Sequence, residues 1–227
     1  MSILSQVWAA VRWRRVHKAL KSVVCIEVDL GNGEKATGTG FVIAPNRICT
    51  CRHVLKGAIS VTIKTADGRT IEASAAQTHF GIIADMALID VANLNLAPLE
   101  IDPNLPAVNE NNTVFVPSRG RKGLRLGKGR LSFRDADELI FITPNLRAIT
   151  QQVELAVVIK ESQSGDSGSP VLTPDGKVRL MVNAYAPTAV VKFKDTPSAR
   201  GLRLYAVTLC ARMGSILADA EALGLTE

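Results

Sequence analysis

The sequence predicts a mostly β protein of the barrel or sandwich class, with one helix at each end. From residue 22 onward, short apolar runs are separated by turn residues, and several runs show the two-residue alternation of strands. There are roughly a dozen such runs, and many short strands with regular turns are typical of barrels and sandwiches. The two ends of the chain instead carry apolar residues at helical spacing.

The first helix is expected over residues 1–22, a stretch without Gly or Pro. Its apolar positions, with basic residues between them, are Leu4, Val7, Trp8, Val11, Trp13, Val16 and Leu20. Two interpretations stay open: a helix packed on the main domain, or a helix that docks on a membrane surface or a partner. The basic residues interrupt the apolar segment that a signal peptide would need. No run of about 18 apolar residues exists, so no transmembrane segment is expected.

The main domain is predicted over residues 23–227, as two sets of strands. The first set covers about 23–100 and has hairpin signals at "LGNGE" and "TADGRT". A connector rich in Pro and Asn follows at 97–112. The second set covers about 113–209, and the C-terminal helix is expected at 211–223.

Charge and cysteine content restrict the interpretation only slightly. The 227 residues carry a formal net charge of +6, which permits an acidic partner without identifying one. Of the four cysteines, Cys49 and Cys51 lie two apart in a predicted strand, where they share a face and pair poorly. We therefore expect reduced, buried thiols and a cytoplasmic location.

The stretch "SQSGDSGSPVL" at 162–172 raises the question of chemistry. Gly, Asp and Ser form tight turns, and a turn before a strand needs nothing more. The alternative is that the bend presents Ser167 as a nucleophile. That role requires a base, an acid that orients the base, and donors for an oxyanion.

Only three histidines can supply the base, and His53 is the best placed of them. His17 lies in the basic helix, and His79 lies in a predicted loop with nothing nearby to orient it. His53 follows a predicted strand, where the chain turns. Asp85 precedes the apolar run "MALIDV" and is the preferred acid; Asp90, late in that strand, is the competitor.

Three motifs in order carry a family resemblance: "GTGFVIAPNRICTCRHV", "ADMALIDV" and "SGDSGSPVL". Together they resemble the chymotrypsin-like (trypsin-fold) serine peptidases, most closely the compact branch of the bacterial high-temperature-requirement proteases. The resemblance covers roughly residues 23–209 and implies two Greek-key antiparallel β-barrels. It implies a serine endopeptidase with His53 as base, Asp85 as its orienting acid and Ser167 as nucleophile. The N–H groups of Gly165 and Ser167 would form the oxyanion hole, and a side chain at Gly165 would crowd the turn.

The chain departs from the family pattern in places. Ser169 replaces the more usual Gly, a small change that we expect to be tolerated. Nothing resembles the Ile-Val-Gly-Gly start that trypsin-type zymogens expose on cleavage, so Asp166 lacks a new N-terminus to pair with. An α/β-hydrolase is excluded, because its Gly-x-Ser-x-Gly signature is not met at 165–169.

Specificity is assigned to three residues of the first substrate pocket: Glu161, Ser162 and Tyr185. Glu161 lies six positions before the nucleophile, where the family often lines the base of that pocket. A carboxylate there would favour Arg or Lys before the scissile bond; the alternative is that Glu161 faces solvent and pairs with a basic residue. The stretch "MVNAYAP" has no His, which argues against the Glu-selective relatives.

Residues 119–130, "RGRKGLRLGKGR", form a basic loop with six Arg or Lys. Such a run is a solvated hairpin tip or a docking site for an acidic partner. Nucleic acid is disfavoured, because aromatic residues make up only 4% of the chain. The alternative to a peptidase acting on peptides or proteins is a catalytically silent, protease-fold binding module that uses this loop. No metal or cofactor is expected.

Overall fold

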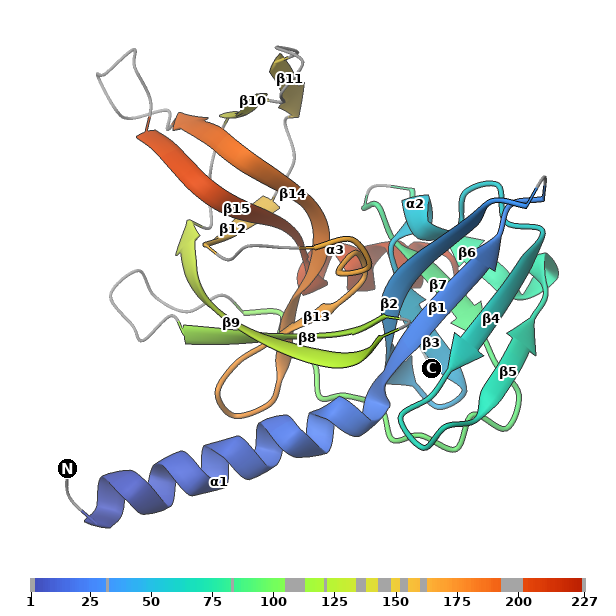
Figure 1. Ribbon diagram of the computed structural model, residues 1–227, viewed down its shortest axis with the longest axis horizontal. Coiled ribbons are helices and arrows are strands. Elements are labelled where there is room, and N and C mark those ends of the chain that lie inside the picture. The colour runs from blue at the N-terminus through green and yellow to red at the C-terminus, as the bar shows by residue number, and fades with distance from the viewer. Residues whose placement is uncertain are drawn as a thin grey trace.

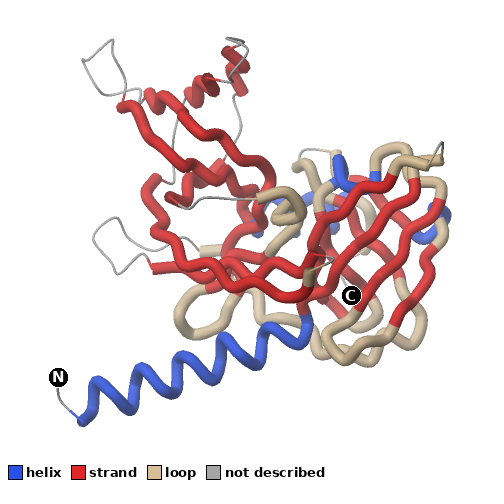
Figure 2. Tube along the Cα trace, viewed as in Figure 1, coloured by secondary structure: helices blue, strands red, loops and turns tan. Residues whose placement is uncertain are grey.

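The computed structural model describes residues 3–31, 33–82, 84–104, 113–120, 122–133, 138–142, 148–151, 155–159, 163–192 and 202–225. Two β-sheets lie side by side, with a helix at each end of the chain (Figures 1 and 2). The strand pairs formed by the described residues are antiparallel. This mostly β architecture confirms the predicted fold class.

The first sheet contains seven strands in the order β5-β4-β1-β2-β3-β7-β6. Their bounds are β1 Val23–Asp29, β2 Lys35–Ala44, β3 Arg47–Thr50, β4 Ser60–Lys64, β5 Thr70–Ala73, β6 Thr78–Phe80 and β7 Ala87–Asp90. Two short helices interrupt them: α2 Arg52–Leu55 directly after β3, and the 3-10 turn η2 Ala75–Gln77. The pairing of β3 with β7 determines where the candidate site lies, because each of these strands adjoins one predicted catalytic residue.

The second sheet contains eight strands, and six of them close into a barrel. Its strands are β8 Thr113–Gly120, β9 Gly123–Phe133, β10 Glu138–Ile142, β11 Ala148–Gln151, β12 Leu155–Ile159, β13 Pro170–Leu172, β14 Val178–Lys192 and β15 Leu202–Arg212. The ring runs β14-β13-β8-β9-β12-β15 and returns to β14 through an additional pairing. The pair β10–β11 attaches to the far end of β14 and extends the sheet beyond the ring (Figure 1).

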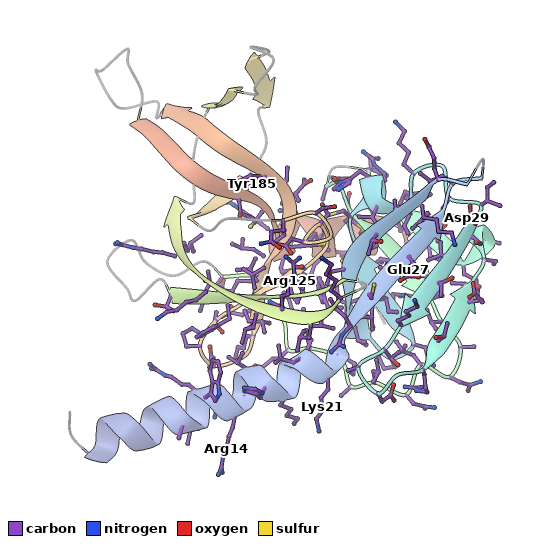
Figure 3. The ribbon with its side chains drawn as sticks, in the orientation of Figure 1. Arg14, Lys21, Glu27, Asp29, Arg125 and Tyr185 are labelled. Carbon is purple, nitrogen blue, oxygen red and sulfur yellow. The ribbon has the colours of Figure 1, made fainter. Side chains whose placement is uncertain are left out.

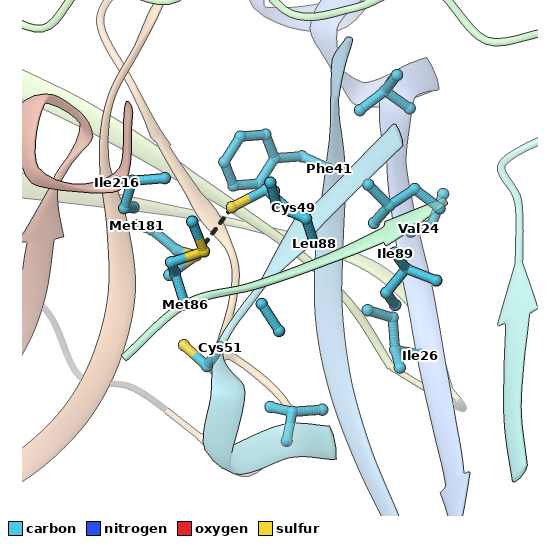
Figure 4. Close-up of a cluster of buried hydrophobic side chains, with 14 of the residues drawn as sticks. Val24, Ile26, Phe41, Cys49, Cys51, Met86, Leu88, Ile89, Met181 and Ile216 are labelled. Carbon is cyan, nitrogen blue, oxygen red and sulfur yellow. Dashed lines mark hydrogen bonds between the residues drawn. The ribbon is translucent and has the colours of Figure 1, made fainter. Parts of the chain in front are cut away.

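The main hydrophobic core runs from the first sheet into the second. Cys49 of β3 contacts Met181 of β14, with 3.8 Å between the two sulfur atoms, and Phe41 packs beside them (Figure 4). Ile216, from the C-terminal helix α3 (Met213–Ala222), belongs to the same core. Because the two sheets share this core, their relative position is fixed by packing rather than by the connector alone.

The N-terminal helix α1, Ile3–Ala19, continues into the 3-10 turn η1, Leu20–Ser22. Its last turns are anchored, since Val16, Ala19 and Leu20 are buried. Trp13 is 48% exposed but meets the Phe115 ring of β8 edge-on, with ring centroids 5.9 Å apart. The end near β1 therefore packs on the domain, and the rest of α1 extends from it (Figure 1). No described helix is long and apolar enough to cross a membrane.

All four cysteines lie in the described part of the chain, are buried and form no disulfide. Burial raises the pKa of the Cys49 thiol far above its usual value, so this side chain stays neutral and packs as an apolar group. The predicted reduced, buried thiols are confirmed.

Candidate active site

Strands β3 and β7 bring His53 and Asp85 together. Thr50 at the end of β3 pairs with Ala87 at the start of β7, so the residues just after β3 and just before β7 are neighbours. His53 lies in α2, which follows β3, and Asp85 lies in the loop that enters β7. The backbone N–H of Arg52 donates to the carbonyl oxygen of Asp85 at 3.3 Å, which links the two segments directly.

The Asp85 carboxylate contacts His53 at two points. One oxygen lies 2.5 Å from Nδ1 of the imidazole, and the other accepts the backbone N–H of His53 at 3.0 Å. An ionised carboxylate only accepts hydrogen bonds, so Nδ1 carries the proton in neutral His53 and Nε2 has the free lone pair. The imidazole is 44% exposed. This is the tautomer that a general base needs.

The competitor Asp90 belongs to a different pair. It binds Arg47 at 2.7 Å and Nε2 of His79 at 3.0 Å. The structure therefore assigns Asp85, not Asp90, to His53. It also corrects the expectation for His79, which lies in strand β6 and is oriented by Asp90.

Ser167 lies on the nucleophile loop, residues 163–169, between β12 and β13. Thr39 of β2 fixes this loop to the first sheet. Its backbone N–H donates to the carbonyl oxygen of Ser167 at 2.9 Å, and its hydroxyl donates to the carbonyl oxygen of Gly165 at 2.7 Å. Thr39 is fully buried. Its role was not predicted from the sequence, and its place in the "GTG" stretch was the only sequence feature that pointed to it.

Gly168 allows the loop to press against the strands that lead to His53. Its φ is +84°, in the region that favours glycine. A Cβ atom here would overlap the carbonyl oxygen of Thr39 and the hydroxyl of Thr50, and it would lie 3.2 Å from the backbone nitrogen of Cys51. The residue after the nucleophile is thus in close contact with the residues just before α2.

The N–H groups of the nucleophile loop follow a pattern that suits an oxyanion. Those of Asp166, Gly168 and Ser169 donate to Gln163, Val182 and Asp166, respectively. Within the described residues, the N–H groups of Gly165 and Ser167 have no acceptor. They are the two groups expected to face the developing negative charge.

Gly165 is needed for a different reason from the one predicted. A Cβ at this position would come no closer than 4.0 Å to the carbonyl oxygen of Thr37, so crowding is not the cause. The cause is the backbone conformation, because φ is +92°, a value that residues other than glycine rarely adopt.

The Ser167 hydroxyl points to β14, the second strand after the loop. It donates to the carbonyl oxygen of Asn183 in β14 at 3.5 Å, and no hydrogen bond joins these two described residues, Ser167 and His53. Catalytic hydrogen bonds are often long or unformed until substrate binds. If His53 acts as the base, the serine hydroxyl turns from Asn183 toward His53 before the proton is transferred.

Cys51 lies close to His53 and Asp85, in a cluster whose donor atoms are within 4.8 Å of one another. A metal would require the thiolate. Burial, reinforced by the negative charge of Asp85, raises the pKa of Cys51 well above its usual value, and Sγ donates to the carbonyl oxygen of Val182 at 3.1 Å. In this structure the thiol is neutral and donates to Val182, and the Asp85 carboxylate is bound to His53.

The pocket residues are only partly covered by the structure. Glu161 and Ser162 lie outside the described residues. Tyr185 lies in β14, 41% exposed, two residues beyond the Asn183 carbonyl that accepts from Ser167 (Figure 3).

The basic loop belongs to the hairpin of β8 and β9, and two of its arginines bind other parts of the domain. Arg119 donates from Nε to the carbonyl oxygen of Val23 at 3.0 Å. Arg125 binds the Asp166 carboxylate, with 2.6 Å between Nη2 and Oδ1. The predicted hairpin tip with only solvated side chains is therefore wrong for Arg119 and Arg125. Sequence reasoning did not link Arg125 to the active site.

The C-terminal helix also reaches the site. Asp219 of α3 is 1% exposed, and its carboxylate accepts the backbone N–H of Ala84 at 2.7 Å. Ala84 directly precedes Asp85, so α3 supports the loop that presents the acid. No signal in the sequence pointed to this contact.

Comparison with known proteins agrees with this geometry. The family described as "Trypsin-like peptidase domain" matches residues 38–179, which contain His53, Asp85 and Ser167. The serine protease Rv3671c of Mycobacterium tuberculosis H37Rv is 28% identical over 151 residues, 62% of this chain and 34% of that protein. Serine protease MT3772 of strain CDC 1551 gives the same figures. The chain thus spans about one third of the length of these curated relatives.

Solved structures share the fold. The active form of the Rv3671c protease from M. tuberculosis has a TM-score of 0.69 and 22% identity, covering 96% of this chain and 88% of that chain. A serine endoprotease from Yersinia pestis has a TM-score of 0.65 and 16% identity, covering 93% and 66%. The chain belongs to the trypsin-like peptidase family, because the family match extends over more than half of the residues of the chain.

Proposed function

We propose that this chain is a serine endopeptidase that hydrolyses peptide bonds through an acyl-enzyme. Ser167 Oγ attacks the carbonyl carbon of the scissile bond while His53 Nε2 takes its proton. Asp85 stabilises the imidazolium that forms. The N–H groups of Gly165 and Ser167 bind the oxyanion of the tetrahedral intermediate. His53 then protonates the leaving amine, and water hydrolyses the acyl-enzyme by the same steps.

The observation that carries this proposal is the double contact between Asp85 and His53. A structural ion pair needs no particular ring tautomer, but a base does. The N–H groups of Gly165 and Ser167, which have no acceptor in the described part of the chain, support the same reaction, because a binding module does not need two such donors beside a serine. Arg119 and Arg125 are already bound to Val23 and Asp166. These contacts weaken the alternative of a catalytically silent binding module that uses its basic loop to bind a partner.

The test is turnover of an activated ester such as p-nitrophenyl acetate. An acyl-enzyme predicts a burst of product equal to the enzyme concentration, followed by slower turnover. The stalled intermediate should carry the acetyl group on the peptide that contains Ser167. A linear time course without any burst, together with no acetylated Ser167 peptide after quenching, would count against the mechanism.

Specificity for Arg or Lys before the scissile bond is part of this proposal. It rests on Glu161, six positions before the nucleophile in the sequence, and on Tyr185, two residues beyond Asn183 in β14. A peptide library cleaved by the parent should show the basic preference, and Glu161→Gln should reduce it without slowing cleavage after uncharged residues. Equal cleavage after all residue types by the parent would contradict the pocket role and favour the alternative that Glu161 faces solvent.

The basic loop keeps a narrower role in this proposal. Lys122, Lys128 and Arg130 are exposed and are the described side chains available to an acidic protein substrate. Their effect should appear only with large acidic substrates and should weaken with salt.

A further inference from the structure

Asp166 is a buried charge at the centre of the nucleophile loop. It separates the two oxyanion donors, Gly165 and Ser167, and only 3% of its side chain is exposed. Burying a carboxylate is costly unless it is paired and hydrogen-bonded. Whatever binds this carboxylate therefore affects the conformation of the residues on either side of it.

The backbone of the loop is wrapped around Asp166. Its carboxylate accepts the backbone N–H of Gln163 at 3.1 Å. Its own N–H donates to the carbonyl oxygen of Gln163 at 3.1 Å, and its carbonyl oxygen accepts the N–H of Ser169 at 2.9 Å. Among the residues that the structure describes, these bonds leave the N–H groups of Gly165 and Ser167 without an acceptor, so the loop conformation and the oxyanion donors depend on the same contacts.

Arg125 supplies the counter-charge. It lies in β9, opposite Ser118 of β8, and its side chain lies in the central region of Figure 3. Nη2 binds the Asp166 carboxylate at 2.6 Å, while Nη1 donates to the side-chain oxygen of Gln163. The guanidinium thus joins two points of the nucleophile loop, which the single ammonium of a lysine cannot match.

We propose that Arg125 is a positioning residue that holds the oxyanion donors in place through Asp166, so that the site forms within the uncleaved chain. This inference rests on the proposed peptidase function. A trypsin-type zymogen needs a new α-amino group to bind the aspartate before its nucleophile. Here the positive charge comes from a strand of the same barrel, 41 positions before Asp166.

The test is a double-variant cycle on turnover. Arg125→Ala should lower kcat about 100-fold with little change in KM, because the loss of one oxyanion donor costs about 10²–10³ in kcat. Asp166→Asn removes the buried charge and should lower kcat less. In the Asp166→Asn background, Arg125→Ala should cost less than about threefold, since interacting residues are not additive. A guanidinium that merely stabilises the fold would give the same factor in both backgrounds.

Lys64→Ala is the matched control. Lys64 is a basic residue of strand β4 in the other sheet, 48% exposed, and it pairs with the Glu27 carboxylate at 2.9 Å, away from the nucleophile loop. This variant should keep parent kcat. Arg125→Lys keeps the charge but lacks the planar fork whose two nitrogens reach Gln163 and Asp166 separately, so its kcat should fall between parent and Arg125→Ala. It also serves if the alanine variant fails to fold.

Intact-mass analysis after reaction with a fluorophosphonate probe tests the second half of the proposal. The full, uncleaved parent chain should carry the probe. A probe found only on shortened chains would overturn the proposal, and so would parent-level kcat in folded Arg125→Ala. No probe on any form of the parent would instead overturn the peptidase function on which this inference rests.

Discussion

Asp85 holds His53 at two points, with one carboxylate oxygen 2.5 Å from Nδ1 and the other accepting the backbone N–H of His53 at 3.0 Å. The first contact sets the tautomer of the ring, and the second fixes the start of helix α2 against the loop before β7. The same carboxylate therefore determines both which ring nitrogen of His53 carries the proton in the neutral imidazole and where the ring lies.

Asp85→Asn should lower kcat by about 10⁴, because an amide can hold the imidazole in the wrong tautomer while leaving the geometry nearly intact. Far-ultraviolet circular dichroism should match that of the parent. Asp90→Asn is the matched control, since it alters the other His–Asp pair and should keep kcat near the parent value. Equal losses in the two variants would show that the effect on turnover is general and not specific to His53.

The Asp90 pair predicts a pH dependence of stability. Burial opposes ionisation of Asp90, but hydrogen bonds from Arg47 and His79 outweigh it and lower the pKa from its usual value of 3.8. A carboxyl with a lowered folded-state pKa stabilises the fold above its usual pKa and loses that contribution as pH falls through the folded pKa.

Urea unfolding of parent and Asp90→Asn at pH 7 and near pH 3 measures this contribution. The parent should lose more stability between the two pH values than the variant does. Both should still lose some, because Asp67, whose pKa is lowered to about 2 by hydrogen bonds from Thr65 and Arg69, titrates in both. Identical acid losses would mean that Asp90 contributes nothing.

The three candidate catalytic residues could be located from the sequence, whereas the contacts that hold them could not. His53, Asp85 and Ser167 each lie in a local motif of strand end and turn, and such motifs are readable along the chain. Thr39 and Gly165 are 126 positions apart, and Arg125 and Asp166 are 41 apart. Those pairs form only when strands pair and the two sheets dock, which no local pattern encodes. For the same reason, the basic composition of residues 119–130 favoured a solvated hairpin, although Arg125 binds the nucleophile loop.

Thr39→Val should weaken both stability and turnover. Valine keeps the shape but removes the hydroxyl that donates to Gly165 and accepts the N–H of Arg119 at 3.1 Å. Leaving such buried groups unsatisfied costs about 1–3 kcal/mol, and kcat should fall at least about tenfold as the peptide of Gly165 loses its anchor. Thr39→Ser retains the hydroxyl and should restore most of the loss. A serine variant as impaired as the valine variant would point to packing instead.

Asp219→Ala should reveal the support that α3 gives to the Asp85 loop. It leaves the buried N–H of Ala84 without this acceptor, at a cost of about 1–3 kcal/mol. The melting temperature should fall by about 2–4 °C for each kcal/mol in a chain of this size. In the folded variant, kcat should also fall, because Asp85 follows Ala84 directly.

Two control variants accompany this test. Asp219→Asn keeps an acceptor for Ala84, so its losses of stability and kcat should be smaller. Glu221→Ala, at an exposed position of the same helix, should match the parent in both. Unchanged kcat in a destabilised Asp219→Ala would limit α3 to a role in stability.

Reaction with a fluorophosphonate probe, mapped by mass spectrometry of digested peptides, tests the activated serine most directly. The parent should form one covalent adduct, on Ser167, at a rate that falls steeply in His53→Ala and Asp85→Asn; heat-denatured parent and Ser167→Ala should form none. Equal labelling of Ser167→Ala, or an adduct on another serine in the folded parent, would contradict the assignment of His53, Asp85 and Ser167 as a catalytic triad.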